Sequence, residues 1–227
     1  MPKIVLHQAH TPPVKSVGSS GFGVTERSVI ESVVTQLKSK LLQSGCTVVV
    51  RNGTQLVREE ADLFLAPHCD GNVKSEPRGF GVYIPKLQTG IYKTKSQDFE
   101  RILENVYAID TGLPHKDRDN RNTDYYYGFD FFPKAPACLI EMGFITNRTD
   151  HDIMVLKQNL VVDGIYRAIR QFLGLTEVQP DPAFKEAWDW AKTNGILTEA
   201  STPDGVVTDA RLAVFLKRYH DKMTSHN

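Results

Sequence analysis

Histidine and glutamate side chains stand near the ends of several predicted strands in this chain of 227 residues. His7 and His10 follow a first apolar strand, and His68 ends the run "ADLFLAPH". Glu26 stands at the start of a predicted helix, and Glu141 comes directly after "CLI". Two imidazoles and one carboxylate can form a three-ligand zinc site with a fourth position open for water. Glu141 would then be the base that removes a proton from that water.

Each of these residues also has an interpretation that needs no metal. A single histidine after a strand is more often a loop or core residue than a ligand, and a glutamate in the first turn of a helix is favourable to the helix dipole. Glu141 is different, because a carboxylate directly after an apolar strand is poorly solvated unless it is paired or functional. Cys69 follows His68 directly, and its thiolate either ligates too or alternates away from the site into packing.

The elements that position these residues predict an α/β domain. Apolar runs predict strands at 3–6, 46–50, 62–66, 79–84 and 136–141. Helical spacing predicts helices over 26–44, 99–109 and 149–173, the first with Thr25 as N-cap and Gly45 as the C′ residue. The segment 115–132 is predicted to be a loop with one short strand. This alternation indicates an α/β fold with a mixed, mostly parallel central sheet flanked by helices on both faces. Ligands of such sheets gather at the carboxyl ends of the strands.

Composition argues against several classes of protein. The 27 Lys and Arg residues equal the 27 Asp and Glu residues in number, so no basic field is predicted that would attract nucleic acid or anionic lipid. No stretch approaches the roughly 20 apolar residues of a membrane span, and the first residues lack the pattern of a signal peptide. The three cysteines, Cys46, Cys69 and Cys138, are expected to be reduced thiols in a protein made in a cytosol.

The order His10, Glu26, His68, Glu141 resembles that of the zinc-dependent N-acetylmuramoyl-L-alanine amidases of the amidase-3 family. In that family a strand ends in a Gly-His turn and a glutamate opens the next helix. A Ser-x-His-x-Asn/Asp element and a Val-Glu-x-Gly-Phe-x-(Ser/Thr)-Asn element follow. This sequence has "HQAH", "GVTERSVIE", "APHCDG" and "LIEMGFITN" at these places, and the resemblance spans about residues 3–173. The last element is the most specific, matching nearly throughout residues 139–147.

The resemblance implies that His10, Glu26 and His68 bind one zinc ion and that Glu141 is the catalytic carboxylate. The implied reaction is hydrolysis of the amide that joins the lactyl group of N-acetylmuramic acid to L-alanine. Zinc would polarise the carbonyl and stabilise the oxyanion, and Glu141 would pass the proton from water to the departing amine.

The first motif departs from the family pattern. Ala9 and Thr11 flank His10 where glycines usually stand, so His7 remains an alternative first ligand. His10 is preferred because His7 still belongs to the predicted strand and His10 lies past its end.

Further contacts are predicted outside this set. The resemblance places the catalytic domain at 1–175, and the polar loop residues Arg118, Asn122 and Tyr126 are expected to line its glycopeptide groove. The prolines of "LTEVQPDP" predict a linker at 176–183 before a small helical domain at 184–227. In that domain "AWDWAKTNGI" and "VVTDARLAVFLKRY" resemble a single S-layer-homology-like repeat or a related wall-binding module, with Trp190 as the expected wall contact.

We therefore expect a peptidoglycan hydrolase that acts on the cell wall. The expected role is that of a phage endolysin made in the host cytoplasm without a signal peptide; an enzyme of the sporulating mother cell is the other role considered. Expected partners are peptidoglycan and a wall polymer, not nucleic acid or membrane, and the C-terminal domain could support an oligomer. The alternatives are a zinc carboxypeptidase or endopeptidase acting on the stem peptide, and a wall-binding protein without activity.

Overall fold

The computed structural model describes residues 1–116, 125–175, 182–194, 217 and 220–221. The chain divides into two compact units, Met1–Thr176 and Glu177–Asn227, which are described separately. Arg118 and Asn122 lie outside the described residues, as does most of the second wall-module segment.

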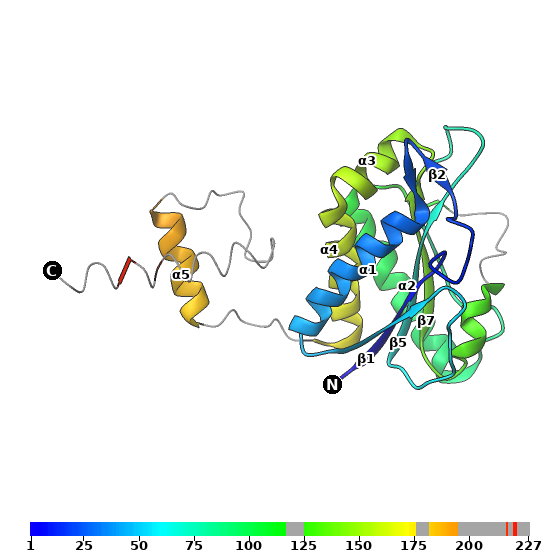
Figure 1. The fold of residues 1–227 in the computed structure, drawn as a ribbon. Coiled ribbons are helices and arrows are strands. Elements are labelled where there is room, and N and C mark those ends of the chain that lie inside the picture. Colours follow the sequence, from blue (N-terminus) through cyan, green and yellow to red (C-terminus); the bar gives the residue numbers. More distant parts are fainter. Residues whose placement is uncertain (117–124, 176–181, 195–216, 218–219, 222–227) are drawn as a thin grey trace. The chain divides into compact units, whose positions relative to one another are not determined.

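The first unit is built on one central sheet (Figure 1). Its strand order is β4 (Thr47–Asn52), β1 (Lys3–Gln8), β5 (Leu63–Asp70), β7 (Ala137–Phe144) and β6 (Gly81–Tyr83). Neighbouring strands are parallel except β6, which pairs antiparallel with β7. A separate two-stranded antiparallel ribbon joins β2 (Ser20–Gly21) to β3 (Val24–Thr25). The predicted mixed, mostly parallel sheet is thus confirmed.

Three helices cover one face of this sheet: α1 (Glu26–Gln43), α2 (Gly90–Thr111) and α4 (Gln158–Leu173) (Figure 1). The apolar stripe of α1 is fully buried there, as its spacing predicts. Thr25 caps α1 in a capping box with Ser28, and Gly45 follows the helix with a φ of 77°. Both predicted ends of α1 are therefore confirmed.

The opposite face of the sheet is covered by a short 3-10 helix, η2 (Tyr127–Phe131), and by the loop after it. Phe132 stacks on Phe64 of β5 with ring centroids 4.2 Å apart. Side chains alternate between the two faces along β1 and β5, and Val5, His7 and Phe64 point to this opposite face. Within the segment 115–132, predicted as a loop with one short strand, the described residues 125–132 contain this 3-10 helix and no strand.

Other element boundaries also differ from the predictions. The helix predicted over 149–173 is two helices, α3 (Arg148–Leu156) and α4, interrupted at Lys157 with φ −119° and ψ 37°. Met154 and Val161 are both buried and keep helical spacing across the interruption, which hides it in the sequence. Helix α2 starts at Gly90 rather than near residue 99, because its first turns are largely exposed and show no apolar stripe.

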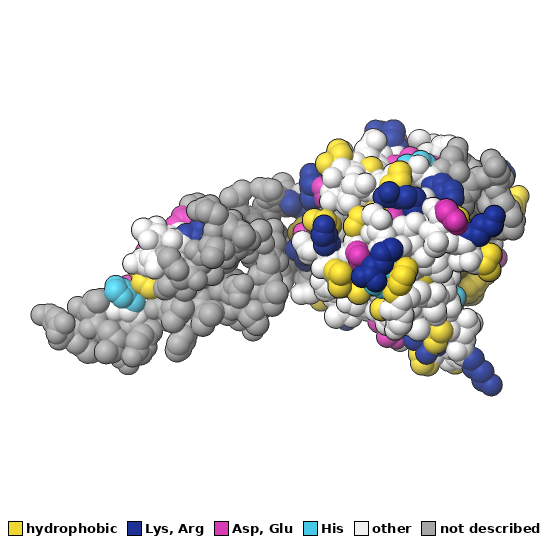
Figure 2. Space-filling view, turned by 90° about the horizontal axis from the view of Figure 1, so that it is seen from above, with side chains coloured by type: hydrophobic (Ala, Val, Ile, Leu, Met, Phe, Trp, Pro, Cys, Tyr) yellow, Lys and Arg dark blue, Asp and Glu magenta, His cyan; other side chains and the backbone are white. Residues whose placement is uncertain are grey.

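The described part of the second unit contains α5 (Pro182–Thr193), which begins inside the predicted linker. Pro182 is the first residue of α5, and proline is well suited to the first position of a helix. A proline therefore does not by itself show that a residue belongs to the linker. Lys217 pairs with Glu186 at 3.1 Å and with Asp221 at 2.8 Å. No described helix has the length and apolarity needed to cross a membrane. On the face of the first unit shown in Figure 2, basic side chains are interspersed with acidic and apolar ones.

Candidate functional site

Strands β5 and β7 place His68 and Glu141 side by side. The two residues are direct partners in the parallel register, so their side chains leave the sheet on the same face. A register shift follows between His68 and Asp70, which is a bulge next to the site. Both residues lie inside their strands, although the sequence places them at strand ends. For Glu141 the error arises because β7 continues through the buried segment Met142–Phe144, beyond the predicted end of the strand at 141.

Glu26 reaches the same place from the first turn of α1. Its carboxylate accepts a hydrogen bond from the backbone N–H of Ser19 at 2.9 Å and another from the N–H of Cys69 at 3.1 Å. Gly18, with a φ of 75°, passes so close that a Cβ there would lie 2.2 Å from Glu26 Oε2. Glycine at position 18 therefore leaves the space that the carboxylate fills.

His10 lies in the turn after β1 with a φ of 60°, which is uncommon for a residue other than glycine. Arg27 holds this turn: its guanidinium donates to the backbone carbonyls of His10, Val14 and Ser16. Since Arg27 follows Glu26 in the helix, one turn of α1 supplies an acidic side chain to the site and a clamp for the loop that carries His10.

His10, Glu26 and His68 converge in space. One potential ligand atom from each lies within 4.8 Å of the others. Glu26 Oε1 is 2.9 Å from His68 Nδ1 and 3.4 Å from His10 Nε2. Burial would raise the pKa of Glu26, but hydrogen bonds from His10 and His68, the charge of His68 and the Ser19 N–H outweigh it, so that the pKa falls to about 2. The carboxylate is therefore ionised throughout the neutral range.

The three side chains fit a divalent cation by their chemistry. Two imidazoles and one carboxylate are a donor set that suits zinc, and a bound cation would replace the protons now shared with Glu26. His68 Nε2 is also buried and has no hydrogen-bond partner among the described residues. Since a buried polar atom without a partner is unfavourable, this imidazole is more readily explained in a site that holds a ligand.

His7, the alternative first ligand, does not take part in this cluster, because both of its ring nitrogens are engaged elsewhere. Its ring is fully buried on the second face of the sheet, where Nε2 lies 2.7 Å from the carbonyl oxygen of Gly53 and Nδ1 contacts the hydroxyl of Tyr126. The ring is stacked on Phe64, with centroids 6.2 Å apart. The structure thus brings His10, not His7, to Glu26 and His68.

Cys69 points to the opposite side of β5 from His68. It is buried in the core cluster under the helices. Burial raises the pKa of its thiol well above the ordinary value, and the negative charges of Glu26 and Glu141 raise it further. The thiol is therefore protonated and packs as an apolar group, which is the second of the two interpretations given for it above.

Of the residues predicted to contact the substrate or the wall, the structure describes Tyr126 and Trp190. Tyr126 lies at the site, but its hydroxyl is directed inward to His7 rather than to a groove. Trp190 is half-buried in the second unit, where its ring meets that of His220 with centroids 5.1 Å apart. Its contact with a wall polymer stays a prediction.

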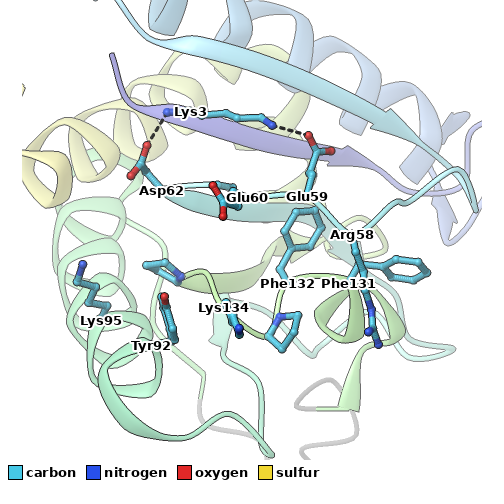
Figure 3. Close-up of a pocket in the computed structure, with 13 residues that line it drawn as sticks. Lys3, Arg58, Glu59, Glu60, Asp62, Tyr92, Lys95, Phe131, Phe132 and Lys134 are labelled. Carbon is cyan, nitrogen blue, oxygen red and sulfur yellow. Dashed lines mark hydrogen bonds and ion pairs between the residues drawn. The ribbon is translucent and has the colours of Figure 1, made fainter.

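A separate cavity of about 800 Å³ opens at the other edge of the sheet (Figure 3). Its lining includes Lys3 at the start of β1, Asp62 just before β5 and Pro136 just before β7. Lys3 is already engaged there, with its Nζ 2.7 Å from Glu59 and its backbone N–H donating to Asp62. This cavity lies at the amino ends of the parallel strands, whereas the histidine and glutamate cluster lies toward their carboxyl ends, where ligands of such sheets bind.

The buried His7 is expected to make the stability of the metal-free protein depend on pH. Burial lowers its pKa from 6.5 to about 4, against the opposing hydrogen bond to Gly53 and with help from the charges of His68 and His10. Between these values the unfolded chain binds a proton that the folded chain does not. The contribution is therefore complete above pH 6.5 and is lost as the pH falls toward 4, in total about 3 kcal/mol.

Urea unfolding with EDTA present, from about pH 7 to about pH 4.5, measures this loss. The lower limit stays near the ordinary pKa of a glutamate, 4.5, below which Glu26 begins to contribute. His7→Gln should be less stable at neutral pH and should lack most of the slope. The same slope in both proteins would contradict this assignment.

The fold and the cluster together define an α/β domain with a candidate cation site at the carboxyl edge of a mostly parallel sheet. The chain belongs to the Amidase_3 family, described as N-acetylmuramoyl-L-alanine amidase, whose match covers residues 4–171. It is 27% identical over 166 residues to the N-acetylmuramoyl-L-alanine amidase LytC of Bacillus subtilis. The match covers 67% of this chain and 31% of LytC. The matched region thus spans about a third of that relative.

Solved structures share the fold. The catalytic domain of CwlV, an N-acetylmuramoyl-L-alanine amidase from Bacillus (Paenibacillus) polymyxa var. colistinus, matches with a TM-score of 0.62 and 20% identity, over 78% of this chain and 100% of that one. The N-acetylmuramyl-L-alanine amidase Ami1 from Mycobacterium smegmatis matches with a TM-score of 0.63 and 17% identity, over 77% of this chain and 98% of that one.

Proposed function

We propose that this chain is a zinc-dependent N-acetylmuramoyl-L-alanine amidase that hydrolyses the amide between N-acetylmuramic acid and L-alanine in peptidoglycan. Membership in the amidase family supports the substrate class. The observation that carries the proposal is the convergence of His10, Glu26 and His68 beside Glu141, which shares a register position with His68. The two histidines and Glu26 would thus hold a cation, while the neighbouring Glu141 accepts a proton.

The roles follow from the chemistry of these side chains. His10, Glu26 and His68 would hold zinc, which when bound polarises the scissile carbonyl and lowers the pKa of a water molecule. Glu141 accepts a proton from the attacking water as the new C–O bond forms. It then delivers this proton to the amide nitrogen as the C–N bond breaks. The products are a free carboxylate on the lactyl group and a free amino group on L-alanine.

Metal analysis and product analysis together test this proposal. The purified protein should contain about one equivalent of zinc, and lysis of cell walls should stop on chelation and return when zinc is added. Digested peptidoglycan should show new amino groups on L-alanine with intact glycan chains. Less than about half an equivalent of zinc, with no gain in activity on adding it, would contradict the enzymatic proposal.

The products also separate the alternatives. New termini elsewhere in the stem peptide would identify a carboxypeptidase or endopeptidase. Sedimentation with cell walls without any product would identify a binding protein without activity.

We further propose that the second unit is a wall-binding module. Its compactness as a separate unit supports this role, because a module that is not part of the catalytic core can hold the enzyme on an insoluble substrate. A variant limited to residues 1–176 should then bind walls more weakly than the full chain while it cleaves soluble muropeptides at a similar rate. An equal loss of both properties would show that the second unit is structural.

The biological role that we propose is that of a phage endolysin, synthesised in the host cytoplasm and acting on the wall. A catalytic unit joined to a module that retains it on the wall suits an enzyme that must lyse cells quickly. Cytoplasmic expression in a susceptible host should cause lysis only after the membrane is permeabilised. Activity confined to spore cortex peptidoglycan would instead favour a sporulation enzyme.

A further inference from the structure

A small cluster of polar groups, buried at His7 and Gly53 and more exposed at its two tyrosines, lies beside the candidate cation site. It consists of the imidazole of His7 in β1, the carbonyl of Gly53 after β4, and the phenols of Tyr126 and Tyr127. Tyr127 donates its hydroxyl hydrogen to Gly53 O at 2.9 Å. His7 lies between the two tyrosines, with ring centroids 5.9 Å from Tyr126 and 6.1 Å from Tyr127. Three distant parts of the chain thus meet at this point.

The hydrogen-bond partners of His7 fix the direction of each bond in this cluster. A carbonyl oxygen only accepts, so His7 Nε2, which lies 2.7 Å from Gly53 O, carries the hydrogen. The ring is neutral because it is buried, and its Nδ1 therefore accepts. The hydroxyl of Tyr126 is then the donor to Nδ1. One arrangement of hydrogens satisfies all these groups, and it commits the Tyr126 hydroxyl to the interior.

The ring of Tyr126 faces His68. The two rings are nearly perpendicular, at 79°, and their centroids are 5.3 Å apart. On its other sides the phenol ring meets Tyr127 at 4.9 Å and Phe129 at 5.5 Å. The ring is thus held at its hydroxyl by His7 and along its edges by aromatic neighbours, and it forms a fixed wall against the His68 imidazole.

We propose that Tyr126 is a positioning residue of the cation site: its hydroxyl is tied to His7, and its ring thereby fixes the His68 imidazole with Nδ1 toward Glu26. Apart from Tyr126, the His68 ring meets that of His10 at 5.5 Å and is held at Nδ1 by Glu26, while its Nε2 makes no hydrogen bond among the described residues. A ligand whose ring is already oriented loses less conformational freedom when a cation binds. The inference deepens the proposed function, on which it rests for the identity of the cation.

Tyr126→Phe tests this role, and Tyr127→Phe is its matched control. Both variants remove one phenol hydroxyl from the same cluster, and both leave an acceptor there short of one donor. Of the two tyrosines, only Tyr126 has its ring against His68. Only Tyr126→Phe therefore removes the hydrogen bond that holds a ring in contact with a proposed zinc ligand. We expect Tyr126→Phe to weaken zinc binding about tenfold, as for other groups that orient metal ligands. Tyr127→Phe should stay within about twofold of the unaltered protein.

Zinc affinity is measured by competition with a chromogenic chelator on the full chain. A positioning role also predicts rescue: the zinc concentration for half-maximal cleavage of a soluble muropeptide should rise about tenfold, while the rate at saturating zinc recovers. Equal weakening by both variants, or unchanged zinc affinity in Tyr126→Phe, would overturn the proposal.

Nitrogen-edited NMR of the histidine rings in the metal-free protein gives a second readout that needs no cation. His68 signals should shift in Tyr126→Phe and not in Tyr127→Phe. If the unaltered protein binds no zinc, the proposed function fails by itself, and the His68 signals still decide the positioning role. A His68 signal that is unchanged in Tyr126→Phe would then overturn it.

Discussion

Glu141→Gln is expected to lower the rate of amide hydrolysis by about 10²–10⁴-fold and to leave the fold and the zinc content unchanged. Glutamine has nearly the same shape as glutamate and fits the same buried position in β7, but it cannot take a proton from water. Burial is the main cause of the raised pKa values of Cys69 and Tyr126, and the negative charges of Glu26 and Glu141, which lie near both groups, add to it. Removing one of these charges should therefore not destabilise the fold.

The measurement is the cleavage rate of a soluble muropeptide at saturating zinc, together with zinc content and thermal unfolding. Glu31→Gln is the matched control, because Glu31 is an exposed residue of α1 and its loss should change none of the three. A Glu141→Gln variant that still clears cell walls would show that another group is the base. Loss of zinc together with activity would show that Glu141 acts through the metal site instead.

The parts of the fold that sequence predicts well are those in which one local pattern decides the structure. Helix α1 is the clearest case, since its apolar stripe, its Thr25 cap and Gly45 after its end all agree. The inner parallel strands β1, β5 and β7 are likewise visible as continuous apolar runs, because they are buried on both faces. The identities of His10, Glu26 and His68 also come from sequence, through their positions next to these elements and through the amidase resemblance.

Boundaries that depend on tertiary contacts are not visible in this way. The end of β7 is one example: "MGF" lies beyond the predicted strand, yet its residues are buried and Phe144 pairs with Asp70 of β5 after the bulge. The first turns of α2 are another, because they are mostly exposed, and Ser96, which is buried there, is engaged by Gln88 and by the backbone of Ala137. A polar residue used in this way gives no periodic signal.

The supports of the site were missed for the same reason. Arg27 and the Tyr126–His7 pair act through contacts between residues that are 17 and 119 positions apart, respectively. Nothing in the local sequence distinguishes Arg27 from an ordinary surface residue of a helix. The choice between His7 and His10 shows the difference best. His7 is held by Gly53 and Tyr126, whereas His10 lies in the turn past β1 and reaches Glu26, and none of these contacts is visible in the local sequence.

Glu26→Gln is expected to weaken zinc binding by at least about 100-fold, since loss of a group that only orients a ligand already costs about 10–100-fold. Glu26 is the centre of the cluster: it contacts both histidines and accepts the N–H groups of Ser19 and Cys69. Glutamine keeps an acceptor oxygen but brings no charge to balance a cation. Activity should therefore be lost and should return only in part at high zinc.

Glu26→Ala should have the same effect on zinc and should also destabilise the metal-free protein. Two backbone N–H groups would lose their acceptor, at about 1–3 kcal/mol for each one left buried without a partner. Urea unfolding with EDTA present measures this loss, with Glu31→Gln again as the control on the same helix. Zinc binding by Glu26→Gln as tight as that of the unaltered protein would exclude Glu26 as a ligand. Comparison with Glu141→Gln then separates the two functions of the site, because one variant should lose the metal and the other should keep it and lose only the proton transfer.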